Sequence, residues 1–426
     1  MVATSARVLL AAALLVLAKA ALAQGDDGYR MAPNKDVVQV DFLANYYSQE
    51  GEFGAVQGGR GTEELTNVAS LTIVTVPLDS NSGLTASAGV DYYSSASTDR
   101  IDRQLSTASS DDVRGYANVA YAERDLDRGR TYTLSAGTSQ EYDYSSFSVG
   151  AGVSQEWNRG AEEVSVFAQA FVDEWDLIYP IELRRRGALE ERGPITDGAR
   201  RSYGLSAVYS RIVNRRVQLA LTAEAILMRG LLSTPFHRIY YRGSVAELPD
   251  LDAVVLPDAD DVERLPDERF KFPVSLRLNY KPNDALAIRA FARYYADSWG
   301  LRGSSLEAEF AYDATEDWTV MPFARVYTQA AADYYAGFGR HLGTEAFYTS
   351  DFDLASFTTY KMGLGLRYAP VLGLGRGGLG RRIVTWRELN LRGAYYTRDP
   401  GLRAFAFTLG TRFDFQRRPS VKTPGR

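Results

Sequence analysis

Four consecutive segments within residues 269–329 alternate apolar and polar residues over about ten or more positions each. In the first of them, Phe272 and Leu276 fall on one side of the chain, while Ser275 and Arg277 fall on the other. A period of two predicts a β-strand. Strands of soluble proteins usually have about 5 to 6 residues, whereas a strand that crosses a bilayer needs about 9 to 11. The segments therefore favour membrane strands with apolar side chains toward lipid and polar side chains toward a lumen.

The same alternation recurs along the chain and predicts sixteen strands. They fall near residues 37–48, 63–77, 83–95, 112–124, 130–142, 145–157, 162–175, 200–212, 216–229, 269–280, 285–297, 304–313, 318–329, 355–368, 383–397 and 402–415. Short turns alternate with connections of which several are long, and this arrangement is typical of outer-membrane barrels. We therefore predict an all-β fold, a transmembrane antiparallel β-barrel of about 16 strands of the outer-membrane type. An even strand count predicts that both termini lie on the short-turn, periplasmic side.

The first residues have the pattern of a secretion signal. Arg7 is followed by an apolar run over residues 8–18 and by small residues at 21–23, as in a cleavable signal peptide. The predicted regions are a signal peptide over 1–23, a periplasmic lead over 24–36, the outer-membrane barrel over 37–415 and a periplasmic tail over 416–426. The predicted location is the bacterial outer membrane.

The composition excludes several classes of function. The chain has no cysteine, which excludes disulfides and thiolate sites. Its formal net charge of −5 argues against nucleic acid as a partner. With only two histidines, His237 and His341, and no Gly-x-Ser-x-Gly motif, we expect no enzyme, no catalytic or metal site and no cofactor. Residues 373–378 formally match a dinucleotide fingerprint, but they join two predicted strands and are expected to form a flexible turn.

The predicted inner face carries most of the charge. The candidate lumen-lining residues are Arg277, Arg289, Arg293, Glu307, Glu309, Arg325, Lys361, Arg367, Glu388 and Arg392. Side chains opposite each other on neighbouring strands lie close enough for arginine and glutamate to pair. The set can be a selectivity lining for an anionic or zwitterionic solute, or a charge ladder that fills the lumen. A barrel of about sixteen strands is wide enough to hold water.

The predicted outer loops carry a second group of candidates. Residues 94–99 (SSASTD) are echoed at 106–111 (STASSD), and each copy can close a local turn or contribute to a ligand site at the barrel mouth. The candidate loop-binding residues are Ser97, Asp99, Ser109, Asp111 and His237. Nine carboxylates in the loop over 230–268 can be a Ca²⁺ site, but their spacing is not that of an EF-hand and a solvated acidic loop is favoured.

Several motifs carry a resemblance to a known family. They occupy residues 58–65, 94–102, 141–146, 235–240, 265–269, 293–299 and 327–335. On these motifs the chain resembles the domain-of-unknown-function 3570 family of predicted bacterial outer-membrane β-barrel proteins. The resemblance covers nearly all of the mature chain and implies a fold and a location, but no established activity.

The patterns predict a channel or receptor for the passage or binding of a small solute. The alternative is a structural sheath or anchor with a filled lumen, which holds a periplasmic or lipoprotein partner such as an electron-transfer component. The expected partners in either case are outer-membrane lipid and, during insertion, the barrel-assembly machinery.

Overall fold

The computed structural model describes residues 36–94, 111–177, 179–183, 196–245 and 258–417. The predicted signal peptide, nearly all of the predicted lead and most of the predicted tail lie outside the described residues.

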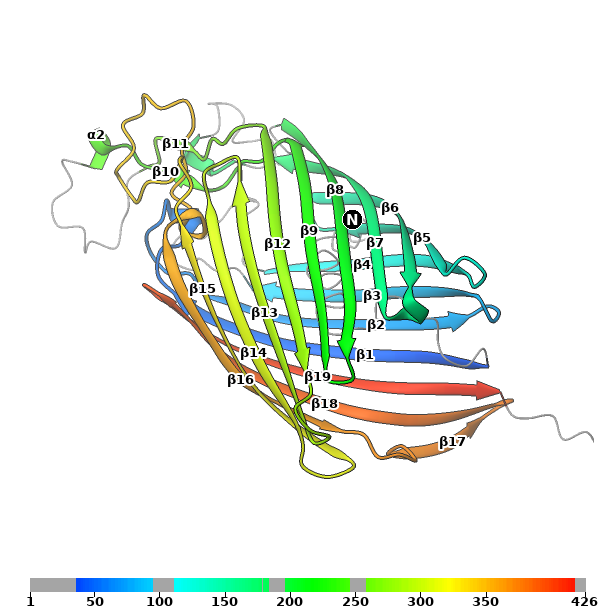
Figure 1. Ribbon diagram of the computed structural model, residues 1–426. Coiled ribbons are helices and arrows are strands. Elements are labelled where there is room, and N and C mark those ends of the chain that lie inside the picture. Colours follow the sequence, from blue (N-terminus) through cyan, green and yellow to red (C-terminus); the bar gives the residue numbers. More distant parts are fainter. Residues whose placement is uncertain (1–35, 95–110, 178, 184–195, 246–257, 418–426) are drawn as a thin grey trace, which may run out of the picture.

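Sixteen long strands form one closed antiparallel barrel (Figure 1). The strands are β1 (Val37–Gly51), β2 (Leu65–Pro77), β3 (Ser82–Ser94), β4 (Asp111–Asp125), β5 (Arg130–Gln140), β6 (Tyr144–Trp157), β7 (Glu162–Leu177), β8 (Thr196–Asn214), β9 (Val217–Gly230), β12 (Glu268–Tyr280), β13 (Leu286–Asp297), β14 (Arg302–Asp313), β15 (Trp318–Ala330), β16 (Phe357–Tyr368), β18 (Arg382–Asp399) and β19 (Leu402–Arg417). The last strand pairs with the first from Val37 opposite Gln416 to Gly51 opposite Leu402. This closure confirms the predicted antiparallel barrel and its number of strands.

The outer face of the barrel is apolar, because every second side chain points away from the lumen. Leu306, Phe310 and Phe407 are among the large apolar side chains that are 44% to 55% exposed on this face. Such exposure would be unfavourable in water but matches contact with lipid. In the described part of the chain, no helix is long and apolar enough to span a membrane.

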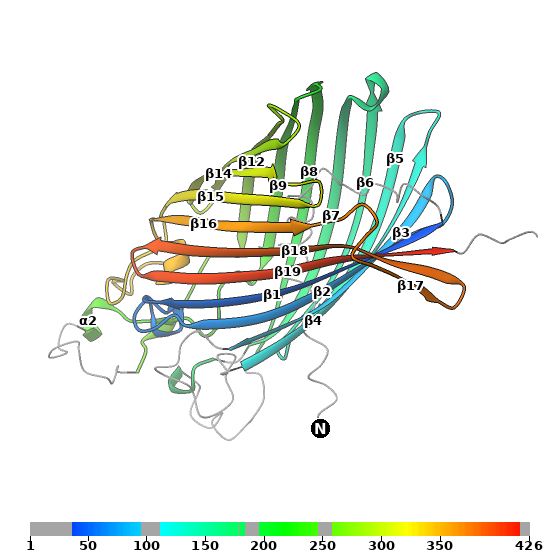
Figure 2. The ribbon, with the colours of Figure 1, turned by 90° about the horizontal axis from the view of Figure 1, so that it is seen from below.

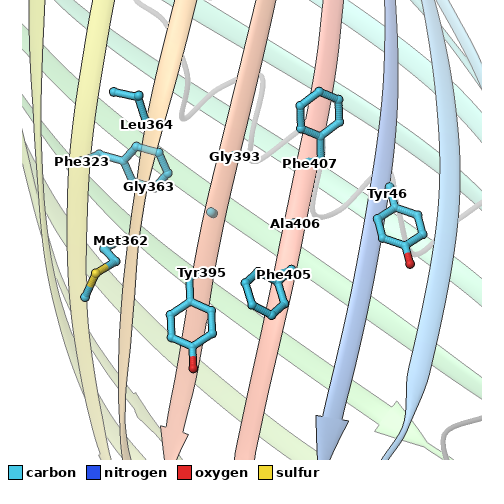
Figure 3. Close-up of a pocket in the computed structure, with 11 residues that line it drawn as sticks. Tyr46, Phe323, Met362, Gly363, Leu364, Gly393, Tyr395, Phe405, Ala406 and Phe407 are labelled. Carbon is cyan, nitrogen blue, oxygen red and sulfur yellow. The ribbon is translucent and has the colours of Figure 1, made fainter.

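A shallow hollow lies in this apolar outer surface (Figure 3). Its lining includes Tyr46, Met362, Tyr395 and Phe405, and Gly393 lies at its centre. A Cβ atom at Gly393 would meet no other heavy atom within 4 Å. The hollow is therefore part of the lipid-facing surface, and lipid chains can fill it without any specific contact.

Described parts of the long connections gather at one end of the barrel and pack together into a body that we call the cap (Figures 1 and 2). It comprises residues 52–64, 179–183, 231–245, 258–267, 298–301 and 331–356. Its short elements are η2 (Ala55–Gln57), η4 (Ile181–Leu183), β10 (Arg238–Ile239), α2 (Arg242–Val245), β11 (Asp261–Val262) and η5 (Phe352–Leu354). The short 3-10 turn η3 (Asn158–Gly160) lies elsewhere, between β6 and β7.

The cap contains a hydrophobic core of its own. Leu265, Trp299, Leu301 and Ala332 form a buried cluster that draws on three connections. Glycines allow two loops to approach closely, since a Cβ on Gly59, which has a φ of 84°, would lie 2.6 Å from a backbone oxygen. Burial of apolar side chains away from water stabilises the cap, whereas the wall leaves its apolar side chains to lipid.

The glycine-rich segment after β16 is not the flexible turn expected from the sequence. Residues Gly375–Leu379 form β17, which pairs with the first residues of β18 from Gly375 opposite Trp386 to Leu379 opposite Arg382. This hairpin projects from the barrel end opposite to the cap (Figure 2). Backbone hydrogen bonds supply the pairing, so the strand forms without an alternating side-chain pattern.

Candidate functional site

The charged residues predicted for the lumen lie on the inner face of the barrel. Arg392 of β18 bonds through Nη1 to Oε2 of Glu309 of β14 at 2.6 Å, although β15 and β16 separate these two strands. Arg293 of β13 likewise reaches Glu224 of β9 at 3.3 Å, past β12. Contacts between strands that are not neighbours cross the concave side of the wall, which places these side chains inside.

One row of inner side chains in cross-strand register crosses six adjacent strands. From β12 to β18 the row is Arg277, Phe291, Glu307, Arg325, Lys361 and Tyr396. Arg325 and Lys361 are direct cross-strand neighbours. Among the described residues, neither has a carboxylate oxygen within 4.0 Å, and the buried Nε of Arg325 has no hydrogen-bond partner. Within the described part of the chain, the row therefore presents two adjacent cations that form no ion pair.

Glu309, two positions after Glu307 on β14, forms ion pairs with two arginines. It accepts from Arg289 at 2.7 Å on Oε1 and from Arg392 at 2.6 Å on Oε2. The guanidinium of Arg392 also lies 3.7 Å from the centre of the Phe323 ring, where the face of the ring attracts a cation. A Cβ on Gly363 would come within 2.4 Å of this ring, so the glycine makes room for it.

We call Arg289, Arg325, Lys361 and Arg392, together with Glu307 and Glu309, the basic patch. Four cations and two carboxylates give it a formal charge of +2. The Arg289 side chain is 50% exposed although it lies on the inner face, so the lumen beside the patch is not filled by neighbouring side chains. The patch can therefore meet a solute dissolved in the lumen.

The other predicted lumen residues lie around the patch. Arg277 stacks on Phe291 with 5.8 Å between the guanidinium carbon and the ring centre. Arg367 pairs with Glu388 at 2.8 Å nearer the end of the barrel away from the cap. Two partners were missed at the sequence level. Glu224 lies on an inward position of β9 that alternation could have identified, whereas the role of Phe323 depends on a contact across three strands.

The structure describes only two of the five predicted loop-binding residues, Asp111 and His237. Ser97, Asp99 and Ser109 lie outside the described residues, and Asp111 begins β4 opposite Ser94. His237 lies in the cap, next to β10.

The acidic loop between β9 and β12 has no common centre for its described carboxylates. Asp260 accepts the backbone N–H of Tyr241, and Asp261 accepts the hydroxyl of Tyr348 at 2.6 Å. Glu268 pairs with Arg229 at 2.7 Å. These separate contacts give no support to a Ca²⁺ site among them.

Arg398 joins the cap to the wall. Its guanidinium pairs with Glu63 at 2.6 Å and with Asp353 at 3.2 Å, and it stacks on the Phe352 ring at 4.7 Å. Burial raises the pKa of Glu63 to about 7, although the charge of Arg398 opposes this shift. Arg398, next to the last residue of β18, therefore anchors two separate cap loops to the wall.

Comparison with solved structures finds distant barrels. A bacterial polysaccharide outer-membrane secretin aligns with a TM-score of 0.44 and 10% identity over 90% of this chain and 100% of the other. The ferric enterobactin receptor PfeA of Pseudomonas aeruginosa has a TM-score of 0.41 and 12% identity over 84% of this chain and 53% of the receptor. The outer-membrane protein opdK of the same organism has a TM-score of 0.38 and 9% identity over 88% of this chain and 98% of opdK. These likenesses are too distant to transfer a ligand or an activity.

No curated protein matches the chain in sequence. The family model described as a protein of unknown function, DUF3570, matches residues 6–405, in agreement with the resemblance that the motifs suggested. With a match over nearly the whole sequence, the chain belongs to the DUF3570 family.

Proposed function

We propose that the barrel is an outer-membrane channel that passes small anionic solutes along the basic patch. The observation that carries this proposal is the pair of neighbouring cations, Arg325 and Lys361, for which the described residues supply no ion-pair partner. Like charges directly opposite each other on neighbouring strands are destabilising. A passing anion would offset this repulsion, and this makes the patch a weak, reversible anion site.

The dimensions of the wall support passage as well as binding. Closed barrels of 16 to 18 strands leave room for an aqueous channel. Charged rings on a lumen wall set the ion preference of a pore, provided that each contact is weak enough for the solute to leave. The half-exposed Arg289 side chain indicates that solvent reaches the patch.

The proposal includes an orientation and a set of partners. The cap would face outward and both termini would face the periplasm, because long loops of such barrels are extracellular and turns are periplasmic. Outer-membrane lipid would surround the apolar face, and the barrel-assembly machinery would insert the chain. The protein would act without catalysis.

The test is the reversal potential of the purified, refolded protein in a planar bilayer under a gradient of KCl at low ionic strength. A unit charge acts on an ion about 10 Å away in water with about 0.4 kcal/mol. The double variant Arg325→Gln, Lys361→Gln should therefore lower the anion preference roughly fourfold or more. Glu309→Gln should raise it, roughly twofold, because two arginines lose their shared carboxylate.

Arg376→Gln is the matched control, because Arg376 is exposed on the projecting strand β17. It removes one cation without touching the lumen and should leave the reversal potential unchanged. A cation-selective wild type, or equal shifts in the control and the patch variants, would overturn the proposal. A correctly folded barrel without conductance would instead favour the sheath with a filled lumen.

A further inference from the structure

Three side chains with metal-ligating atoms meet inside the cap. His237, Glu263 and Asp351 each place one such atom within 4.8 Å of the other two. The Nδ1 atom of His237 lies 3.5 Å from Oε2 of Glu263 and 3.9 Å from Oδ2 of Asp351. The three residues come from two different connections, so the site exists only once the cap has folded.

Backbone pairing explains why His237 and Glu263 face each other. The strands β10 and β11 pair with Arg238 opposite Val262, and the backbone N–H of Glu263 donates to the carbonyl of His237 at 2.8 Å. Directly opposite residues of an antiparallel pair have neighbouring side chains. The connection before η5 joins this ribbon through the bridge between Arg264 and Tyr348, which brings Asp351 to the same place.

Other groups hold both carboxylates in position. Glu263 accepts the backbone N–H of Thr234 at 2.7 Å and the hydroxyl of Thr349 at 2.5 Å. Asp351 accepts the backbone N–H of Asp353 on Oδ1, which leaves its Oδ2 toward His237. Oriented ligands of this kind are characteristic of metal sites, where hydrogen bonds fix each carboxylate before the ion arrives.

The histidine has an unused coordinating atom. The Nδ1 of His237 is buried and has no hydrogen-bond partner among the described residues, since 3.5 Å to the glutamate exceeds a normal hydrogen bond. Burial raises the pKa of Asp351 to about 6, although His237 opposes this shift. Burial lowers the pKa of His237, but Glu263 and Asp351 outweigh it and leave that pKa above its ordinary value. One imidazole can carry at most one positive charge against the two carboxylates, so the cluster is imperfectly compensated without a further cation.

We propose that His237, Glu263 and Asp351 bind a divalent first-row transition cation, with Zn²⁺ as the best fit. Zinc accepts one imidazole nitrogen and two carboxylate oxygens at about 2.0–2.2 Å, which places tetrahedral ligands about 3.4 Å apart. The distances from His237 Nδ1 to the two carboxylate oxygens, 3.5 and 3.9 Å, are close to this value. The imidazole disfavours Ca²⁺ and Mg²⁺, which prefer oxygen ligands.

The three side chains leave one coordination position for water or a further ligand. Glu263 is 2% exposed, whereas Asp351 is 24% exposed, so the ion would enter from the side of the aspartate. Because a bound ion would link the connection between β9 and β12 to the connection between β15 and β16, it would stabilise the cap. This role is independent of ion passage along the basic patch.

The experiment is equilibrium dialysis of the tag-free, refolded full-length protein against Zn²⁺, with Ca²⁺ in a parallel series. The wild type should bind one Zn²⁺ per chain. His237→Gln and Asp351→Asn should each weaken Zn²⁺ binding roughly 100-fold or more. Loss of a metal ligand should cost more than the roughly 10- to 100-fold loss of affinity that follows when a group hydrogen-bonded to a ligand is removed. Heat-modifiable electrophoretic mobility would show that each variant is folded.

The chain offers two matched controls. His341→Gln removes the only other histidine, which bonds through Nε2 to the carbonyl of Thr349. Asp353→Asn removes an exposed carboxylate two residues from Asp351. Both should retain one high-affinity site. Stoichiometric Zn²⁺ uptake that survives in the ligand variants, no uptake by the wild type, or tighter binding of Ca²⁺ than of Zn²⁺ would overturn the proposal.

Discussion

The wall of the barrel and the cap hold their charges in different ways. In the wall, Arg289 and Glu309 are direct cross-strand neighbours, and half of the arginine side chain remains exposed. In the cap, Arg238 pairs with Glu182 from another loop at 2.6 Å, with 1% and 4% of the two side chains exposed. The wall pair follows from strand register, whereas the cap pair requires several loops to fold onto one another.

This difference has an energetic consequence. An exposed ion pair contributes about 0–1 kcal/mol, but removing one partner of a buried pair costs about 3–5 kcal/mol because the other charge stays buried alone. The charge of Arg289 can therefore change with little effect on stability, and this freedom suits a surface that sets ion preference. Charges in the cap are part of its structure.

Loss of the last strand should prevent assembly of both the wall and the cap, which is the largest effect that we predict. A chain truncated before Phe405 lacks nearly all of β19, so β1 and β18 lose the partner that closes the barrel. Unpaired strand edges in lipid leave backbone groups without hydrogen bonds. We expect no assembled protein, as measured by heat-modifiable mobility in isolated outer membranes. A folded, heat-modifiable truncated form would contradict this expectation.

Breaking the buried ion pair of the cap should destabilise the cap and leave the stability of the wall unchanged. Glu182→Ala removes the carboxylate that pairs with Arg238 inside the cap, and a loss of about 3–5 kcal/mol should speed hydrogen exchange in β10 and β11 roughly 100-fold or more. Exchange in β14 and β15 should stay unchanged. The matched wall variant is Arg289→Ala, which should alter exchange less than tenfold in either region. Equal effects of the two variants would remove the distinction between wall and cap.

A smaller effect of pH is expected at the junction of the two regions. Burial raises the pKa of Glu63 from its ordinary value of 4.5 to about 7 in the folded cap. A raised pKa means that the folded state binds the proton more tightly than the unfolded state does. The contribution of this proton to the free energy of unfolding is therefore full below about pH 4.5 and is lost as the pH rises through about 7. The charged groups that face the same carboxyl are Arg398, Asp353 and Asp351.

The corresponding measurement is hydrogen exchange of residues 52–64, corrected for its intrinsic dependence on pH. Protection should fall between pH 5 and pH 8 in the wild type. Glu63→Gln keeps the size of the side chain and removes the titration, so its protection should vary less over this range. Identical pH profiles for both proteins would rule out Glu63 as the cause.

The alternation of side chains was sufficient to predict the wall. All sixteen strands and the inward direction of residues such as Arg325 and Lys361 follow from a period of two, because lipid requires an apolar face on every strand. The glycine-rich segment that forms β17 was mispredicted since it has no alternating pattern. The link from Arg392 to Glu309 could not be predicted either, because it depends on the curvature that brings β18 toward β14.

The cap shows the limit of the same approach. The sequence marks His237 as one of only two histidines, yet nothing in its spacing from Glu263 or Asp351 indicates that the three meet. A strand in lipid has one apolar and one polar face, so the amino-acid order determines which side chains line the lumen. Loops have no such period, and only their packing into a common core places distant residues side by side.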